Sequence, residues 1–130
     1  MGMAEEVTLK PNYEKLCSKI LNSDEHIRFT GFVNDKSKIL HSEQKDNLDS
    51  LLNDHEVAMS IHYTLERWRK AQNFTFRLGK ERLTFTEYDN VTLVTIPFKG
   101  TLLLVSTEPR ISYDPIIEKI NSILTDWEKI

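Results

Sequence analysis

The sequence predicts an α+β fold: a single domain in which helices flank a five-stranded antiparallel sheet, in the order α-β-β-α-β-β-β-α. Two observations lead to it. Helical periodicity occurs near both ends of the chain and again in its middle, and strand-like segments fall into two groups around the central helix. A length of 130 residues suits one domain. We expect that domain over residues 11–130, after a flexible N-terminus over residues 1–10.

The first element is expected to be an amphipathic helix over residues 13–21. Its apolar side chains recur at the spacing of a single helical stripe: Tyr13, Leu16, Cys17, Ile20 and Leu21. Pro11 suits the first turn, where a missing N–H costs nothing. The polar residues 22–25 are expected to end the helix.

A β-hairpin is expected next. Residues 27–33 alternate as a strand does, residues 34–37 have the composition of a turn, and residues 38–41 supply a short return strand. Gly31 inside the first strand indicates a bulge or a close approach by a packed helix. Residues 43–46 are expected to be a polar linker.

The central helix is expected to begin at Asn53, with Glu56 completing a reciprocal capping box. A short helical turn is expected just before it, at Leu48, Leu51 and Leu52. The core-facing stripe is Val57, Ile61, Leu65 and Trp68. Gly79 is expected as the C-terminal cap, although Asn73–Arg77 would suit a strand equally well.

A three-stranded meander is expected after the central helix. Residues 83–88 and 91–96 form its first two strands, joined by a turn at residues 89–90. Residues 97–100 are expected to turn the chain again. The apolar run at residues 102–105 is typical of a central strand that is covered on both faces.

The last element is expected to be a helix that Asp114 caps and Pro115 begins. Its stripe is Ile116, Ile117, Ile120, Ile123, Leu124 and Trp127.

Composition and charge favour a soluble cytoplasmic protein. The net charge of −3 gives no general attraction to nucleic acid or to anionic membranes. Cys17 is the single cysteine, which indicates a reducing compartment. The N-terminus lacks the pattern of a signal peptide, and the longest apolar run, residues 102–105, is far too short to span a membrane.

No motif of catalysis, cofactor binding or metal binding stands out, so we expect no enzyme, no cofactor and no metal. The four glycines cannot form a phosphate-binding loop. His55, His62 and Glu66 would share one helical face, but the two histidines are seven residues apart, which is about 10 Å of helix. Cys17 lies in an apolar stripe, where a cysteine packs as a small hydrophobe.

Residues 67–82 are the most basic part of the chain. Six basic side chains against Glu81 give this segment a local charge of +5, and aromatic residues are interleaved. The simplest interpretation is that cations near a helix C-terminus complement the helix dipole. An acidic protein partner comes second, and a nucleic acid, which such a mixture can also bind, comes third.

The order of elements, together with residues 88–105, resembles the roadblock/dynein-light-chain-like family, a relative of the longin and profilin-like folds. In that segment a strand ends in the step Ile96-Pro97, a turn follows with Gly100, and a run of leucine and valine comes next. The chain also resembles an uncharacterised archaeal family of similar length, which implies no assigned activity.

The roadblock resemblance implies a non-enzymatic regulatory or scaffold module that forms a homodimer through its long helix and the neighbouring sheet edge. It also implies a protein partner such as a small GTPase or a signalling component. The sequence adds a second apolar stripe on the central helix, Met59, Tyr63 and Phe74, opposite the first. With Arg67 and Lys70 these are the expected interface residues, unless the terminal helices cover the stripe.

The alternative function is a small-ligand sensor of the PAS-like or profilin-like kind. It requires a pocket between sheet and helices, lined by residues such as Phe29, Phe85 and Leu104.

Overall fold

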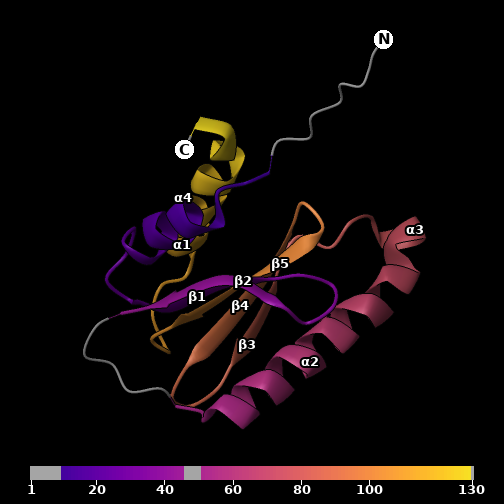
Figure 1. The fold of residues 1–130 in the computed structure, drawn as a ribbon, viewed down its shortest axis with the longest axis horizontal. Coiled ribbons are helices and arrows are strands. Elements are labelled where there is room, and N and C mark those ends of the chain that lie inside the picture. The colour runs from indigo at the N-terminus through magenta and orange to yellow at the C-terminus, as the bar shows by residue number, and fades with distance from the viewer. Residues whose placement is uncertain (1–9, 46–50, 130) are drawn as a thin grey trace.

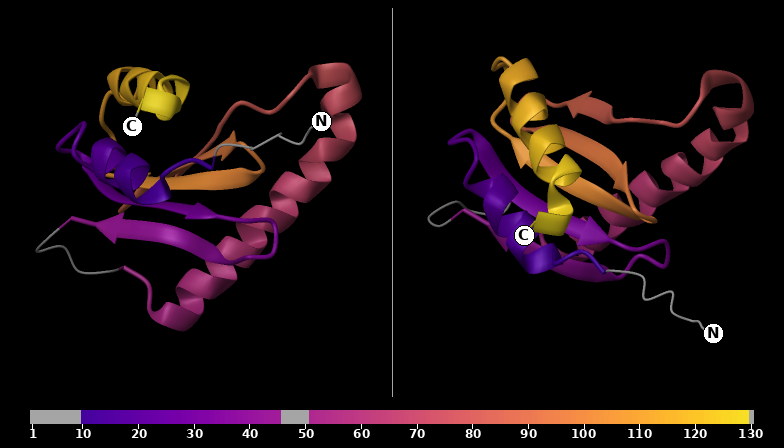
Figure 2. Two further views of the ribbon diagram at one scale, coloured as in Figure 1. Left: turned by 45° about the horizontal axis from the view of Figure 1, so that its top comes forward. Right: turned by 90° about the horizontal axis from the view of Figure 1, so that it is seen from above.

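A five-stranded antiparallel sheet separates two helical layers in the computed structural model, which describes residues 10–45 and 51–129. Helices α1 (Tyr13–Leu21) and α4 (Asp114–Thr125) pack side by side on one face, and the long helix α2 (Asp54–Ala71) crosses the other (Figures 1 and 2). The predicted fold class and element order are confirmed. Residues 1–9 of the expected flexible N-terminus lie outside the described residues, and so does Leu48.

The strands are arranged in the order β2-β1-β5-β4-β3, so the last strand in sequence lies at the centre. β5 pairs with β1 on one side and with β4 on the other, and both pairings are antiparallel. Leu102 and Leu103 belong to the buried clusters on opposite faces of the sheet and are both completely buried, so the expectation of a central strand that is covered on both faces is confirmed. The strand bounds are Ile27–Val33, Ile39–Gln44, Thr84–Glu87, Thr92–Phe98 and Thr101–Thr107 for β1 to β5.

Helix α1 has the bounds that its apolar spacing predicts, but Pro11 does not lie in its first turn. Asn12 is the N-cap, and its side-chain oxygen accepts a hydrogen bond from the Lys15 N–H at 3.1 Å. Pro11 therefore precedes the cap instead of lying in the first turn. Leu16, Cys17 and Ile20 are completely buried against the sheet, as their spacing predicts.

Strand β2 continues to Gln44, so residues 43 and 44 are not the linker that their polarity indicated. The carboxylate of Glu43 explains this, because it faces α1 and accepts hydrogen bonds from the Ser18 hydroxyl at 2.7 and 2.8 Å. Nε2 of His41 lies 2.9 Å from the same carboxylate. The bonds from Ser18 and then His41 lower the pKa of Glu43.

Gly31 is crowded by its own sheet and not by a helix. A Cβ at this position would lie 3.0 Å from Cζ of Phe29 and 3.2 Å from Cβ of Ser42 on β2. The β1–β2 register shifts at Phe32/Val33, which places the bulge next to Gly31. Glycine is needed here because the Phe29 ring lies across the position.

The capping box at the start of α2 is present as predicted. Oδ1 of Asn53 accepts a hydrogen bond from the Glu56 N–H at 2.8 Å, and Oε1 of Glu56 accepts one from the Asn53 N–H at 3.0 Å. Asn53 itself has an extended backbone, so the helix cannot extend backward through it. Leu51 and Leu52 form a bend, and the helical turn expected there is wrong.

Beyond Ala71 the chain stays helical. A 3₁₀ turn, η1 (Gln72–Phe74), leads into the short helix α3 (Thr75–Leu78), which ends at Gly79 with φ at +85°. Asn73–Arg77 is therefore helical, and the predicted glycine cap is confirmed.

The turn between β4 and β5 is tighter than expected. Lys99 and Gly100, with φ of +49° and +79°, form a two-residue turn, and Pro97 and Phe98 belong to β4. Proline is tolerated at position 97 because β3 pairs with β4 only as far as Thr95, so no ladder bond is lost on that side.

Helix α4 has its N-cap at Tyr113, and Asp114 is the first helical residue instead of the cap. A 3₁₀ turn, η2 (Trp127–Lys129), follows the helix. The Trp127 ring packs edge-on against Phe98 at 6.2 Å between centroids, which continues the predicted stripe.

Asp24 joins the turn after α1 to helix α4. Its carboxylate accepts hydrogen bonds from the His26 N–H at 2.9 Å and from Nζ of Lys119 at 3.0 Å. Burial raises the pKa of Asp24, but the bonds from the His26 backbone, Lys119 and the His26 ring outweigh it and hold the pKa at about 2.

Replacing Asn53 by alanine is expected to lower the free energy of unfolding by about 1 kcal/mol, because the Glu56 N–H loses the side-chain oxygen that accepts its hydrogen bond. Urea denaturation measures this, and Asn53→Asp, which keeps the cap, should remain close to wild type. An unchanged midpoint for Asn53→Ala would contradict the assigned role of the box.

Asp24 is expected to make stability depend on pH below its ordinary pKa of 3.8. Because the folded-state pKa is lowered, its contribution is complete above that value and is lost as the pH falls toward 2. The free energy of unfolding should therefore be higher for wild type than for Asp24→Asn at neutral pH, and this difference should disappear in acid. Glu25→Gln, which removes an exposed neighbouring carboxylate, is the control. A difference in the free energy of unfolding that stays constant with pH would refute the assigned role of Asp24.

Candidate functional site

The outward face of α2 carries large apolar side chains that no described element covers. Met59, Tyr63 and Phe74 are 60%, 72% and 60% exposed. Ile61 and Leu65, on the opposite side of the helix, are buried against the sheet with Val33 and Leu102. Helices α1 and α4 lie across the sheet from this face (Figure 2), so they do not cover it. We call Met59, Tyr63 and Lys70 of α2, together with Phe74 of the following turn η1, the outer stripe.

The two expected basic interface residues differ in what their charges contact. Lys70 is exposed on the outer stripe. Arg67 points toward the start of β3, where its Nη2 donates to Oε2 of Glu81 at 2.8 Å and to Oγ1 of Thr84 at 2.9 Å. The guanidinium of Arg67 therefore connects α2 to the edge of the sheet through these two hydrogen bonds.

The exposed apolar surface continues beyond the predicted residues. Phe76 and Leu78 on α3 are 77% and 82% exposed, at the end of the long helix away from the sheet (Figure 1). A signal for this was present in the sequence. After Trp68 the core stripe would require apolar residues at positions 72 and 75, which are Gln72 and Thr75, so the helix has no apolar face for the core there.

Most arginines of the basic segment interact within the chain. Nη1 of Arg69 contacts Glu66 at 2.9 Å, and its Nη2 donates to the carbonyl oxygen of Asp35 in the β1–β2 turn. The Arg77 guanidinium lies 5.3 Å from the centroid of the Phe76 ring. Arg69 and Lys70 also fall in the last turn of α2, where cations complement the helix dipole.

Strand β3 forms one edge of the sheet and pairs only with β4. Arg67 connects the α2 flank to this edge through Glu81 and Thr84. The outer stripe and an open strand edge are thus neighbours. An open edge offers unpaired N–H and C=O groups to a second chain.

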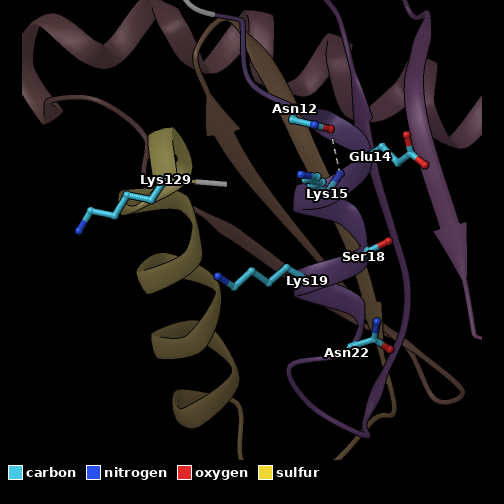
Figure 3. Close-up of a pocket in the computed structure, with 7 residues that line it drawn as sticks. All are labelled: Asn12, Glu14, Lys15, Ser18, Lys19, Asn22 and Lys129. Carbon is cyan, nitrogen blue, oxygen red and sulfur yellow. Dashed lines mark hydrogen bonds between the residues drawn. The ribbon is translucent and has the colours of Figure 1, made fainter.

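A groove of about 630 Å³ runs beside α1, but its side chains do not converge (Figure 3). Glu14 and Ser18 point to one side of α1, and Lys129 on η2 extends the other way. The Ser18 hydroxyl is already bonded to Glu43. The groove therefore lacks a common point at which a ligand would be held.

The polar groups around Ser18 do not form a nucleophile. Glu43 lies between Ser18 and His41, so the serine donates to a carboxylate and not to an imidazole, unlike an activated serine. Burial raises the pKa of the Cys17 thiol to about 11, which keeps it protonated. Among the described residues no three His, Cys, Asp or Glu side chains are grouped to hold a metal ion.

A cleft of about 100 Å³ lies between α2 and the sheet. Phe29 and Leu104 line it, as the sensor hypothesis expected. Phe85 does not, because its ring packs on Tyr113 at 5.3 Å between centroids, on the face that α4 covers. Thr95 also lines the cleft, and its Oγ1 has no hydrogen-bond partner in the described part of the chain. Such a buried hydroxyl costs about 1–3 kcal/mol. In the sequence Thr95 is recognisable only as a strand residue, and no neighbouring residue indicates that its hydroxyl is unpaired.

No helix in residues 10–45 and 51–129 is both long enough and apolar enough to cross a membrane.

Solved structures of similar fold come from roadblock proteins. The Roadblock/LC7 domain from Streptomyces avermitilis superposes with a TM-score of 0.68 at 12% identity, covering 88% of this chain and 93% of that one. MglB of Myxococcus xanthus gives 0.68 at 13% identity, with 95% and 92% covered. An MglB structure described as having a tetrameric arrangement gives 0.66 at 10% identity, with 98% of each chain covered.

These likenesses show that the fold is that of the roadblock/LC7 domain, as the resemblance implied. No curated protein matches the sequence. Over residues 4–130 the chain matches a family model described as a family of unknown function, DUF6659. The protein is therefore a member of the DUF6659 family, built on a roadblock/LC7-like fold.

Proposed function

We propose that this protein is a non-enzymatic regulatory or scaffold module that self-associates through the outer stripe of α2 and the adjacent β3 edge. The observation that carries the proposal is the exposure of Met59 and Tyr63 on a helix whose opposite side is buried, continued by the exposed Phe74 of η1. Exposed apolar patches of this kind mark interaction surfaces. The tetrameric arrangement described for one MglB structure adds support from the same fold.

The spacing of the outer stripe suits a two-fold dimer with antiparallel helices. In such a pair, positions whose numbers have the same sum face each other. An axis between Glu66 and Arg67 places Met59 opposite Phe74 of the second copy, and Tyr63 opposite its Lys70. A thioether against an aromatic ring and a cation over a ring are both favourable pairs. All four outer-stripe residues thus find complementary partners about one axis.

We further propose that the dimer acts in the cytoplasm on a protein partner such as a small GTPase or a signalling component. A nucleic acid partner has less support, because Arg67 and Arg69 are paired with Glu81 and Glu66. An enzymatic role has no support from the Ser18, Cys17 and histidine surroundings described above.

Replacing Tyr63 by glutamate is expected to weaken self-association by about 30-fold, which corresponds to the 2 kcal/mol of an aromatic hot spot. The substitution places a charge in the apolar centre of the interface. Light scattering across a dilution series measures the mass, which for wild type should approach twice 15.2 kDa.

The matched control is His62→Glu, which adds the same charge to the adjacent exposed position on the flank away from β3. It should leave the dimer and the unfolding midpoint as in wild type. Tyr63→Glu should have the wild-type midpoint at concentrations at which wild type is a monomer, because neither side chain is buried within one chain. A wild-type monomer at every concentration, or an unaffected dimer in Tyr63→Glu, would refute the proposal.

A further inference from the structure

The cleft beneath α2 exists because short side chains face each other across it. Ser60 and Thr64 on the helix lie over Thr95 and Ser106 on the sheet. Farther along the same helix, Leu65 packs with Val33 and Leu102, and all three side chains are buried. Protein interiors are normally filled to the density of organic crystals. The unfilled space therefore results from the short side chains at these four positions and not from loose packing of the whole helix on the sheet.

The remaining walls are apolar, and their composition restricts what the cleft can hold. Among described residues every lining side chain is apolar or a hydroxyl: Phe29, Leu52, Val57, Ser60, Ile61, Thr64, Leu93, Val94, Thr95, Leu104, Val105 and Ser106. An ion would find no counter-charge in this lining and would lose its hydration. The lining thus selects neutral molecules.

Thr95 supplies the polar contact. It is 9% exposed and it lines the cleft, and among the buried side-chain nitrogen and oxygen atoms of the described chain its Oγ1 alone lacks a hydrogen-bond partner. Its neighbour across the cleft, Thr64, uses its own hydroxyl to donate to the carbonyl oxygen of Ser60 at 2.8 Å. A buried, unpaired hydroxyl in the wall of an apolar space is satisfied when a bound molecule brings a hydrogen-bonding group to it.

We propose that this cleft is a binding site for a small, neutral, mostly apolar molecule that carries one hydrogen-bonding group, which Thr95 recognises. An apolar cavity of about 150 Å³ accepts benzene. The cleft is smaller, at about 100 Å³, but it is not enclosed, so a single ring with one hydroxyl would fill it and extend partly outside it. The site shares no residue with the outer stripe, so it stands independently of the proposed dimer.

Phenol is the probe, and benzene is its matched control without the hydroxyl. Methyl-detected NMR titration of the full chain should show saturable phenol shifts at Val57, Ile61, Leu93 and Leu104. Thr95→Val keeps the shape of the side chain and removes the hydroxyl. It should weaken phenol binding by about tenfold, as expected for one hydrogen bond, and leave benzene binding unchanged.

Thr125→Val provides the protein control and should bind phenol as wild type does, because Thr125 is an exposed residue of α4, outside both the cleft and the proposed interface. Unfolding midpoints establish that each variant is folded, and Thr95→Val should be at least as stable as wild type since it removes an unpaired hydroxyl. Absence of methyl shifts with either probe, or equal phenol affinity in wild type and Thr95→Val, would overturn the proposal.

Discussion

The structure depends on burying both faces of the central strand β5. Leu102 and Leu103 point to opposite faces of the sheet, and both are completely buried. Each face must therefore be covered by helix, as is usual for a strand with no polar side. The two faces are covered to different extents. Among the described helices, α1 and α4 share one face, and α2 covers the other (Figure 2).

The unequal cover explains where the functional candidates lie. The face under α1 and α4 holds the larger group of buried residues, which extends from Leu16 through Phe98 to Leu124. On the α2 face the buried group is small, and the cleft opens beside it. With no described helix beside α2, its outward side and the β3 edge stay exposed. The proposed interface and the proposed ligand site thus have a common origin in one helix covering a wide sheet.

Arg67 and Asp24 perform similar tasks on the two faces. Arg67 connects α2 to the start of β3 through Glu81 and Thr84, and Asp24 connects the α1–β1 turn to α4 through Lys119. Each uses a charged group to fix the position of a helix over the sheet where apolar packing ends. Charge-assisted bonds are directional, whereas apolar contacts between a helix and a sheet tolerate sliding.

The sequence by itself determined the elements and their local chemistry. The capping box of Asn53 and Glu56, the glycine cap at Gly79 and the two stripes of α2 depend on residues a few positions apart, so spacing was sufficient to predict them. Tertiary structure decided the rest, because periodicity shows which side of an element is apolar but not which element it meets. Only the fold revealed that Glu43 belongs to a strand bonded to Ser18, that Arg67 is turned toward Glu81, and that Thr95 lies unpaired beneath α2. These contacts join residues distant in sequence, and short side chains leave a cleft only where the chain brings them face to face.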